Sequence, residues 1–159
     1  MFAASLCLAV AGLAGPVPVS GPQVQARLIA PASLAAGGKG IVVLEMTLGP
    51  GWHVNSHRPL QSFLIPTTAT LTTSSGTLSD IHYPEPVKKR FEFADQPLAV
   101  YHGTVRFESE LALPATATGK VTLGGVLAYQ PCNDSQCFPP AKATLNATVD
   151  VAGAQAKGK

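Results

Sequence analysis

Alternation of apolar and polar residues with a period of two is the feature that most constrains the fold of this chain. The alternation recurs between residues 23 and 151, and no segment shows a sustained helical period. Glycine and proline, at 15 and 14 residues of 159, separate the alternating segments at short intervals. We therefore predict about eight strands. Such a pattern is typical of an all-β fold, an antiparallel β-sandwich.

The predicted strands differ in length, and two regions between them need a separate interpretation. The strands are expected at residues 23–30, 41–48, 52–57, 67–73, 78–83, 98–113, 120–129 and 141–151. Gly103 is expected to mark a bulge in the longest of them. The segment 87–97 is the least regular part and carries Phe91 and Phe93. Either these rings anchor a loop in the core, or one of them lies over the cysteines.

The composition and motifs argue against several classes of function. The formal net charge is +2 and only 13% of residues are charged, which gives no basic surface for nucleic acid. The sequence contains neither a Gly-x-Ser-x-Gly elbow nor a phosphate-binding glycine loop. Glu108 and Glu110 share one face of a predicted strand, which we expect to be solvated. A nucleic-acid-binding or hydrolytic function therefore finds no support here.

The first 26 residues are expected to form a secretory signal and a Pro-rich linker. Residues 1–26 carry no charge, and the apolar run 6–14 ends in small residues, as a signal sequence does. Cleavage after Ala14 or after Ala26 would satisfy the small-residue rule. Either cleavage would remove Cys7 and place the mature protein in an oxidising compartment.

Two cysteines remain in the expected folded domain, residues 27–151, which a disordered tail at 152–159 follows. Cys132 and Cys137 are separated by four polar, turn-forming residues. A disulfide across so short a loop contributes about 2 kcal/mol in the chain-entropy model, against about 4.7 kcal/mol for a 100-residue loop. A chain of this length buries enough apolar surface to fold without such a bond. Short-loop disulfides tend to be labile, so this pair suits chemistry better than stabilisation.

Two other interpretations of the cysteine pair stay open. The disulfide could be a structural bond that never cycles, in an immunoglobulin-like interaction module. Alternatively, both thiolates could join His53 and His57 in a Cys2His2 site for zinc or copper. The spacing of these histidines suits a helix better than a strand, and we expect neither a metal nor another cofactor.

The residues around the cysteines resemble the signature of a known protein family. Tyr129-Gln130-Pro131-Cys132, followed after four residues by Cys137-Phe138-Pro139-Pro140, is similar to the motif of the N-terminal periplasmic domain of the thiol:disulfide interchange protein DsbD (the disulfide bond corrector family). Weaker motifs follow the family order: Gly51-Trp52-His53-Val54-Asn55, Tyr83-Pro84, Glu92-Phe93 and Val100-Tyr101-x-Gly103. The cysteines are one residue closer together than in the best-known members, and Pro131 stands where a small residue is common.

The resemblance implies a function as well as a fold. It implies an immunoglobulin-like β-sandwich that relays reducing equivalents in the periplasm, as a component of a protein-disulfide reductase. In full-length relatives, electrons pass from cytoplasmic thioredoxin through a membrane domain and a C-terminal thioredoxin-like domain to this module. The module then reduces disulfide isomerases and the thioredoxins of cytochrome c biogenesis. Its partners are thus thioredoxin-like periplasmic proteins, which it meets in transient mixed disulfides.

The resemblance also implies roles for particular residues. Cys137 would form the mixed disulfide with a partner, and Cys132 would resolve it. Phe93, or Phe91 in its place, would shield the pair from a cap loop. The immediate surroundings of the pair would be formed by Tyr129, Gln130, Asp134 and Phe138. A carboxylate beside the cysteines is expected to raise the thiol pKa, so we predict a protected dithiol that reacts slowly until a partner displaces the cap.

Overall fold

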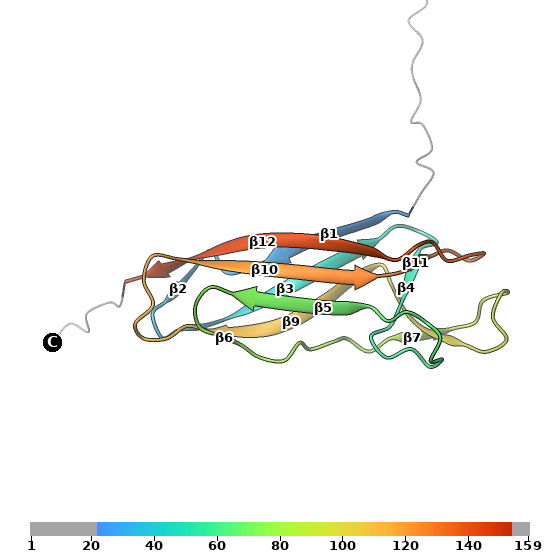
Figure 1. Cartoon of the computed structure of the whole chain (residues 1–159), viewed down its shortest axis with the longest axis horizontal. Helices are drawn as coiled ribbons and strands as arrows, with labels where there is room; N and C mark the ends of the chain where they lie inside the picture. Colours follow the sequence, from blue (N-terminus) through green and yellow to red (C-terminus); the bar gives the residue numbers. More distant parts are fainter. Residues whose placement is uncertain (1–21, 154–159) are drawn as a thin grey trace, which may run out of the picture.

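A computed structural model describes residues 22–153, and all of their regular elements are β-strands (Figure 1). The strands are β1 (Val24–Ile29), β2 (Ser33–Ala35), β3 (Lys39–Leu48), β4 (His53–Asn55), β5 (Thr68–Thr73), β6 (Thr77–Leu78), β7 (Val87–Lys89), β8 (Leu98–His102), β9 (Thr104–Ala112), β10 (Lys120–Tyr129), β11 (Pro131–Cys132) and β12 (Ala141–Ala152). None of the described residues forms a helix able to cross a membrane. Residues 1–21 of the expected signal sequence and linker (residues 1–26), and residues 154–159 of the expected tail (residues 152–159), lie outside the described residues.

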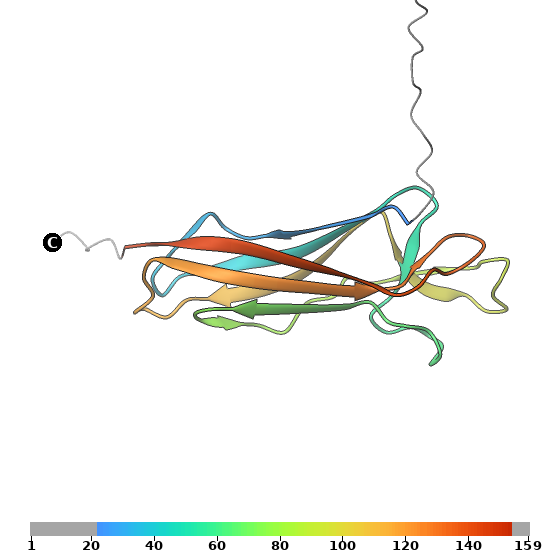
Figure 2. The ribbon, with the colours of Figure 1, turned by 45° about the horizontal axis from the view of Figure 1, so that its top comes forward.

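Two four-stranded sheets form the sandwich, and a third four-stranded sheet lies at one end of it (Figures 1 and 2). The strand orders are β1-β3-β9-β6 and β2-β12-β10-β5 in the sandwich, and β11-β4-β8-β7 in the end sheet. β2 pairs with β12 in parallel, and the other strand pairs of the described residues are antiparallel. The predicted immunoglobulin-like antiparallel β-sandwich is therefore confirmed.

The alternating residues of the long strands form the core of the sandwich. Along β9, Phe107 is fully buried, whereas its neighbour Arg106 is exposed. Phe107 packs in one cluster with Leu44 of β3 and Leu127 of β10, which are also fully buried. Burial of each such side chain contributes about 1.5–3 kcal/mol relative to an exposed position. The period-two pattern thus predicts the strands, and burial of its apolar residues holds the two sheets together.

The prediction of one long strand over residues 98–113 is wrong. Residues 98–102 form β8 in the end sheet, and residues 104–112 form β9 in the sandwich. Gly103, between them, has a φ of 65°, a conformation that glycine adopts without steric cost. The chain therefore changes sheets at Gly103 instead of forming a bulge. Two further short strands, β2 and β7, lie in segments that the sequence predicted to be irregular.

The cysteine-bearing turn connects two strands that are neighbours in one sheet. β10 and β12 pair from Lys120 opposite Asp150 to Tyr129 opposite Ala141, and the turn follows directly. Both views place this turn at the same end of the molecule as the loops at 57–66 and 90–97 (Figures 1 and 2). At the start of the domain, Ala26 lies inside β1, so cleavage after Ala26 would remove part of this strand.

Candidate redox site

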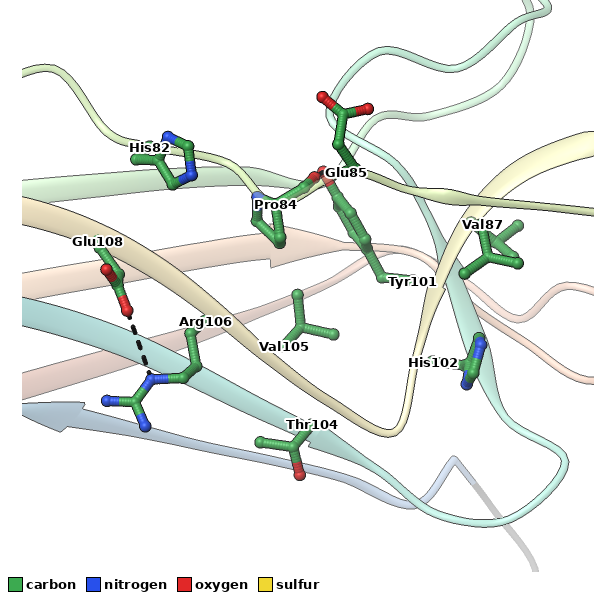
Figure 3. Close-up of a pocket in the computed structure, with 11 residues that line it drawn as sticks. His82, Pro84, Glu85, Val87, Tyr101, His102, Thr104, Val105, Arg106 and Glu108 are labelled. Atoms are coloured by element: carbon green, nitrogen blue, oxygen red, sulfur yellow. Dashed lines mark hydrogen bonds and ion pairs between the residues drawn. The ribbon is translucent and has the colours of Figure 1, made fainter.

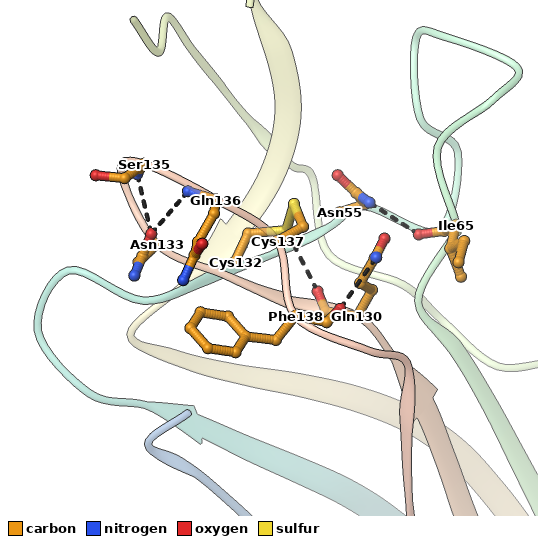
Figure 4. The surroundings of a disulfide bond; sticks show 9 residues. All are labelled: Asn55, Ile65, Gln130, Cys132, Asn133, Ser135, Gln136, Cys137 and Phe138. Atoms are coloured by element: carbon orange, nitrogen blue, oxygen red, sulfur yellow. Dashed lines mark hydrogen bonds between the residues drawn. A yellow bond between two sulfur atoms is a disulfide. The ribbon is translucent and has the colours of Figure 1, made fainter. Parts of the chain in front are cut away.

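The cysteine hairpin, residues 131–138, carries a disulfide whose surroundings are drawn in Figure 4. Cys132 and Cys137 form a disulfide with their Cα atoms 4.0 Å apart. Cys132 lies in β11 and is fully buried, whereas Cys137 is exposed. The Asn133 side-chain oxygen accepts the backbone N–H groups of Ser135 and Gln136, each at 2.9 Å. This local turn holds Cys137 at the surface while its partner stays inside.

Gln130 and Phe138 fix the base of the cysteine hairpin. The Gln130 amide donates a hydrogen bond to the Phe138 carbonyl oxygen at 3.1 Å, and the Phe138 N–H donates to the Pro131 carbonyl oxygen at 2.8 Å. The Phe138 ring packs against Trp52, with 5.1 Å between ring centroids. Tyr129 ends β10 just before the hairpin and packs against the main core, where burial raises its pKa.

The rings of His53, Phe91 and Phe93 form a stack that begins beside Cys132 and extends toward the surface. His53 of β4 pairs with Cys132 of β11. The His53 ring stacks on Phe91, with 4.2 Å between centroids, and Phe91 stacks on Phe93 at 5.3 Å. Phe91 is buried, whereas Phe93 is 44% exposed. The family resemblance implied Phe93 as the shield of the cysteines, with Phe91 as the alternative, and Phe93 stacks on the outside of Phe91.

Lys89 is a charged residue of the site that the sequence analysis did not identify. Its ammonium group lies 3.2 Å from the Asp134 carboxylate and 4.9 Å from the centroid of the Phe91 ring. From the sequence around the cysteines, only the carboxylate of Asp134 was expected near the pair. Because Lys89 is 45 residues from Asp134 in the chain, local sequence could not reveal that the negative charge of the hairpin is paired.

His53 is uncharged at neutral pH. Burial, and next the nearby positive charge of Lys89, lower the pKa of His53 from 6.5 to about 4. Its Nε2 atom is buried and has no hydrogen-bond partner among the described residues. A neutral imidazole with an unpaired nitrogen therefore lies next to the buried cysteine.

His57 lies in different surroundings from His53. Its ring stacks on Tyr83, with 4.3 Å between centroids, and its Nδ1 atom is 2.7 Å from the Tyr101 hydroxyl. That hydroxyl donates its one proton to the Pro84 carbonyl oxygen at 3.0 Å, so Nδ1 of His57 is the donor to Tyr101. Across residues 22–153, no three His, Cys, Asp or Glu side chains are grouped to hold a metal.

A separate concave surface lies over the junction of β8 and β9 (Figure 3). Tyr101 and Val105 are among its lining residues, together with Glu85 and the ion-paired side chains of Arg106 and Glu108, which approach to 3.6 Å. Neither cysteine lines this surface. It is a feature of the bend in the chain rather than part of the redox site.

Comparisons with known proteins identify a family and two similar solved structures. The family model of the N-terminal domain of the thiol:disulfide interchange protein DsbD matches residues 24–148. The N-terminal periplasmic domain of ScsB from Proteus mirabilis has a TM-score of 0.52 and 22% identity, over 82% of this chain and 48% of that chain. The N-terminal domain of Neisseria meningitidis DsbD, in its reduced form, has a TM-score of 0.46 and 16% identity, over 77% of this chain and 87% of that chain. No protein with a curated description matches the chain. This chain thus spans about half the length of the ScsB domain.

Proposed function

Because this chain belongs to the family of the N-terminal domain of the thiol:disulfide interchange protein DsbD, we propose that it relays reducing equivalents to partner proteins through a reversible Cys132–Cys137 disulfide. The observation that carries the proposal is the unequal exposure of the two cysteines. Thiol–disulfide exchange needs a sulfur that a partner can reach, and Cys137 is exposed. A second sulfur must stay close without being attacked itself, and Cys132 is buried against β4.

The exchange proceeds in two steps. In the reduced domain, the Cys137 thiolate attacks the disulfide of a partner and forms a mixed disulfide, and one partner sulfur leaves as a thiolate. Cys132 then attacks the Cys137 sulfur, which restores the Cys132–Cys137 bond and releases the second partner sulfur. The domain loses two electrons and the partner gains them. The same steps in reverse would load the domain from an electron donor.

The segment 90–97, here called the cap segment, serves as the shield in this mechanism. Phe91 of this segment packs on His53, the cross-strand neighbour of Cys132, and Phe93 covers Phe91. The Lys89–Asp134 ion pair connects the start of the cap segment to the cysteine hairpin. A partner that displaces the cap segment would uncover the buried side of the disulfide, at Cys132, whereas the Cys137 side is exposed with the cap segment in place.

The partners and compartment follow from the family and the chemistry. We assign the domain to the periplasm, because the similar ScsB domain is described as periplasmic and disulfides persist in oxidising compartments. Its partners would be thioredoxin-like proteins, met in transient mixed disulfides, with the disulfide isomerases and the thioredoxins of cytochrome c biogenesis as acceptors. The activity would be that of a protein-disulfide reductase component.

The reduction potential of the Cys132–Cys137 pair tests this proposal. Purified protein is equilibrated in glutathione or dithiothreitol buffers, and free thiols are trapped by alkylation. A relay requires a potential between about −270 and −120 mV, the range of thioredoxin-like donors and oxidants. A potential far below about −300 mV would instead indicate a structural bond, and the chain would then be a non-cycling interaction module.

Trapping of mixed disulfides tests the two cysteine roles. With a thioredoxin-like partner, Cys132→Ser should accumulate a stable mixed disulfide because nothing resolves it. Cys137→Ser should accumulate far less, since its remaining thiol is buried. Equal accumulation in both variants would contradict the assigned roles.

A further inference from the structure

His53 is a buried polar side chain that the two exchange steps do not yet use. It lies directly opposite Cys132 in the antiparallel β4–β11 pair, and it is 3% exposed against 0% for Cys132. Opposite residues of antiparallel strands project their side chains from the same face, with Cβ atoms about 4.5–5.5 Å apart. The side chains of His53 and Cys132 are therefore neighbours on one face of the end sheet.

The Nε2 atom of His53 has no structural task in the described part of the chain. It is buried and without a hydrogen-bond partner there, although buried polar atoms in folded proteins are nearly always paired. Phe91 stacks on the face of the His53 ring. The Nε2 atom lies at the edge of the ring and is not engaged by this stacking. A buried nitrogen without a hydrogen-bond partner, in the side chain opposite Cys132, indicates a role in the chemistry of Cys132.

Cys132 needs a proton acceptor in the second step of the exchange. It must lose its thiol proton to attack Cys137, and its burial disfavours the free thiolate. The Gln130 carbonyl oxygen lies 3.8 Å from the Cys132 sulfur; it can accept a hydrogen bond from the reduced thiol but is too weak a base to take the proton.

From this arrangement we infer that His53 is the general base of the exchange, with Nε2 taking the proton of Cys132 while the Cys132 sulfur attacks Cys137. This inference rests on the proposed function. The new bond joins the two sulfurs of the domain, and the bond between Cys137 and the partner breaks. The partner sulfur leaves with the electron pair, and the proton passes from His53 to that thiolate or to water. In the reverse direction, the imidazolium protonates Cys132 as it leaves.

The cap segment would also control the strength of this base. Three charged or titratable groups act on His53: Lys89 from β7, Asp134 from the cysteine hairpin and His102 from β8. Burial and Lys89 together lower the pKa of His53 to about 4, whereas Asp134 raises it. Displacement of Phe91 and Lys89 by a partner would remove the two larger lowering effects, those of burial and of Lys89, and leave the smaller one of His102. The motion that exposes the disulfide would thus make His53 a better proton acceptor.

The reaction of the reduced domain with 5,5′-dithiobis(2-nitrobenzoate) separates the two steps. Attack by Cys137 releases one thionitrobenzoate anion, and attack by Cys132 on the resulting adduct releases the second. At pH 7, His53→Gln and His53→Phe should slow the second release by about a hundredfold or more, the scale of general base catalysis. The first release should stay nearly unchanged. His82→Gln, at an exposed histidine, is the matched control and should leave both releases unchanged.

The pH dependence of the wild-type protein tests the same inference without a variant. With His53 as the base, the second release should be nearly flat from about pH 7 to pH 8, because the imidazole is already deprotonated. Without a base, its rate should rise about tenfold per pH unit as thiolate forms. That rise, or an unchanged second release in both His53 variants, would overturn the inference and leave the proposed function intact. A wild-type protein that releases no second anion would instead remove the proposed function.

Discussion

The Lys89 ammonium lies 3.2 Å from the Asp134 carboxylate, and this ion pair joins the strand before the cap segment to the tip of the cysteine hairpin. The two side chains are 49% and 66% exposed, so the pair contributes little to global stability. Its position matters more than its strength, because it connects the two segments that would separate to uncover the buried Cys132 side of the disulfide.

Removal of this ion pair should speed the alkylation of the reduced protein. An exposed pair is worth about 0.2–1 kcal/mol, so Lys89→Gln should raise the rate of Cys137 alkylation by up to about fivefold at low salt. High salt should reduce the difference, because it screens exposed charges. Lys120→Gln, which removes the ion pair with Asp150 at the far end of β10, is the control. Equal effects of both variants would contradict a local role for Lys89.

The two phenylalanines of the cap segment should differ sharply in their contribution to stability. Phe91 is 6% exposed and packs with Leu98 and Val100, so Phe91→Ala should lower the free energy of unfolding by about 3 kcal/mol or more. Phe93 is 44% exposed, and Phe93→Ala should cost less than about 1 kcal/mol. Urea unfolding measures both values. Similar losses in the two variants would mean that the rings are equally buried in solution.

The buried neutral state of His53 predicts a loss of stability in mild acid. Its pKa is lowered to about 4 in the folded protein, from 6.5, so the unfolded chain binds the proton more readily. The contribution of neutral His53 is complete above pH 6.5 and declines as the pH falls to about 4. The size of this pKa shift corresponds to a change of roughly 3 kcal/mol in the free energy of unfolding.

A comparison of wild type with His53→Phe isolates this contribution. Urea unfolding between about pH 7 and pH 4 should show a shallower pH dependence in the variant. Burial also lowers the pKa of His57, and this effect of the same sign persists in both proteins and cancels in the difference. Identical pH dependences would show that His53 titrates normally in the folded state.

Reduction of the disulfide should leave the domain folded. The bond closes a loop whose ends are five residues apart, and the chain-entropy model gives about 2 kcal/mol for so short a loop. Cys137→Ser removes the bond at an exposed position, so it adds no buried polar group. We expect a loss of about 2 kcal/mol in urea unfolding. Loss of the folded state on reduction would instead make the disulfide a structural bond.

The sequence predicted the long strands well and the end sheet poorly, for reasons that particular residues make clear. β10 begins at Lys120 and ends at Tyr129, as the alternation indicated. The three residues of β7 are all exposed, so this strand forms through backbone pairing with β8 alone and carries no apolar period. The alternation runs across Gly103 without interruption, so the sequence does not reveal the change of sheet, which the strand pairing shows and the positive φ of Gly103 accompanies.

The same limit applies to the site. The cysteine motif predicted a turn between Cys132 and Cys137, because its residues are contiguous. The pairing of His53 with Cys132, and of Lys89 with Asp134, joins segments far apart in the chain. From the sequence, His53 was a potential metal ligand and part of a weaker family motif, and no local signal marked it as the neighbour of Cys132.

The ladder between β10 and β12, which runs from Lys120 opposite Asp150 to Tyr129 opposite Ala141, has a thermodynamic consequence for the chemistry at its end. If the disulfide stabilises the fold by about 2 kcal/mol, linkage requires that the fold stabilise the disulfide over the dithiol by the same amount. For a two-electron couple, 1.4 kcal/mol corresponds to about 30 mV. Folding should therefore lower the reduction potential by about 40 mV relative to the unfolded chain, because the paired strands hold both thiols at high effective concentration. The sandwich would thus make the dithiol a stronger electron donor than the cysteine peptide alone.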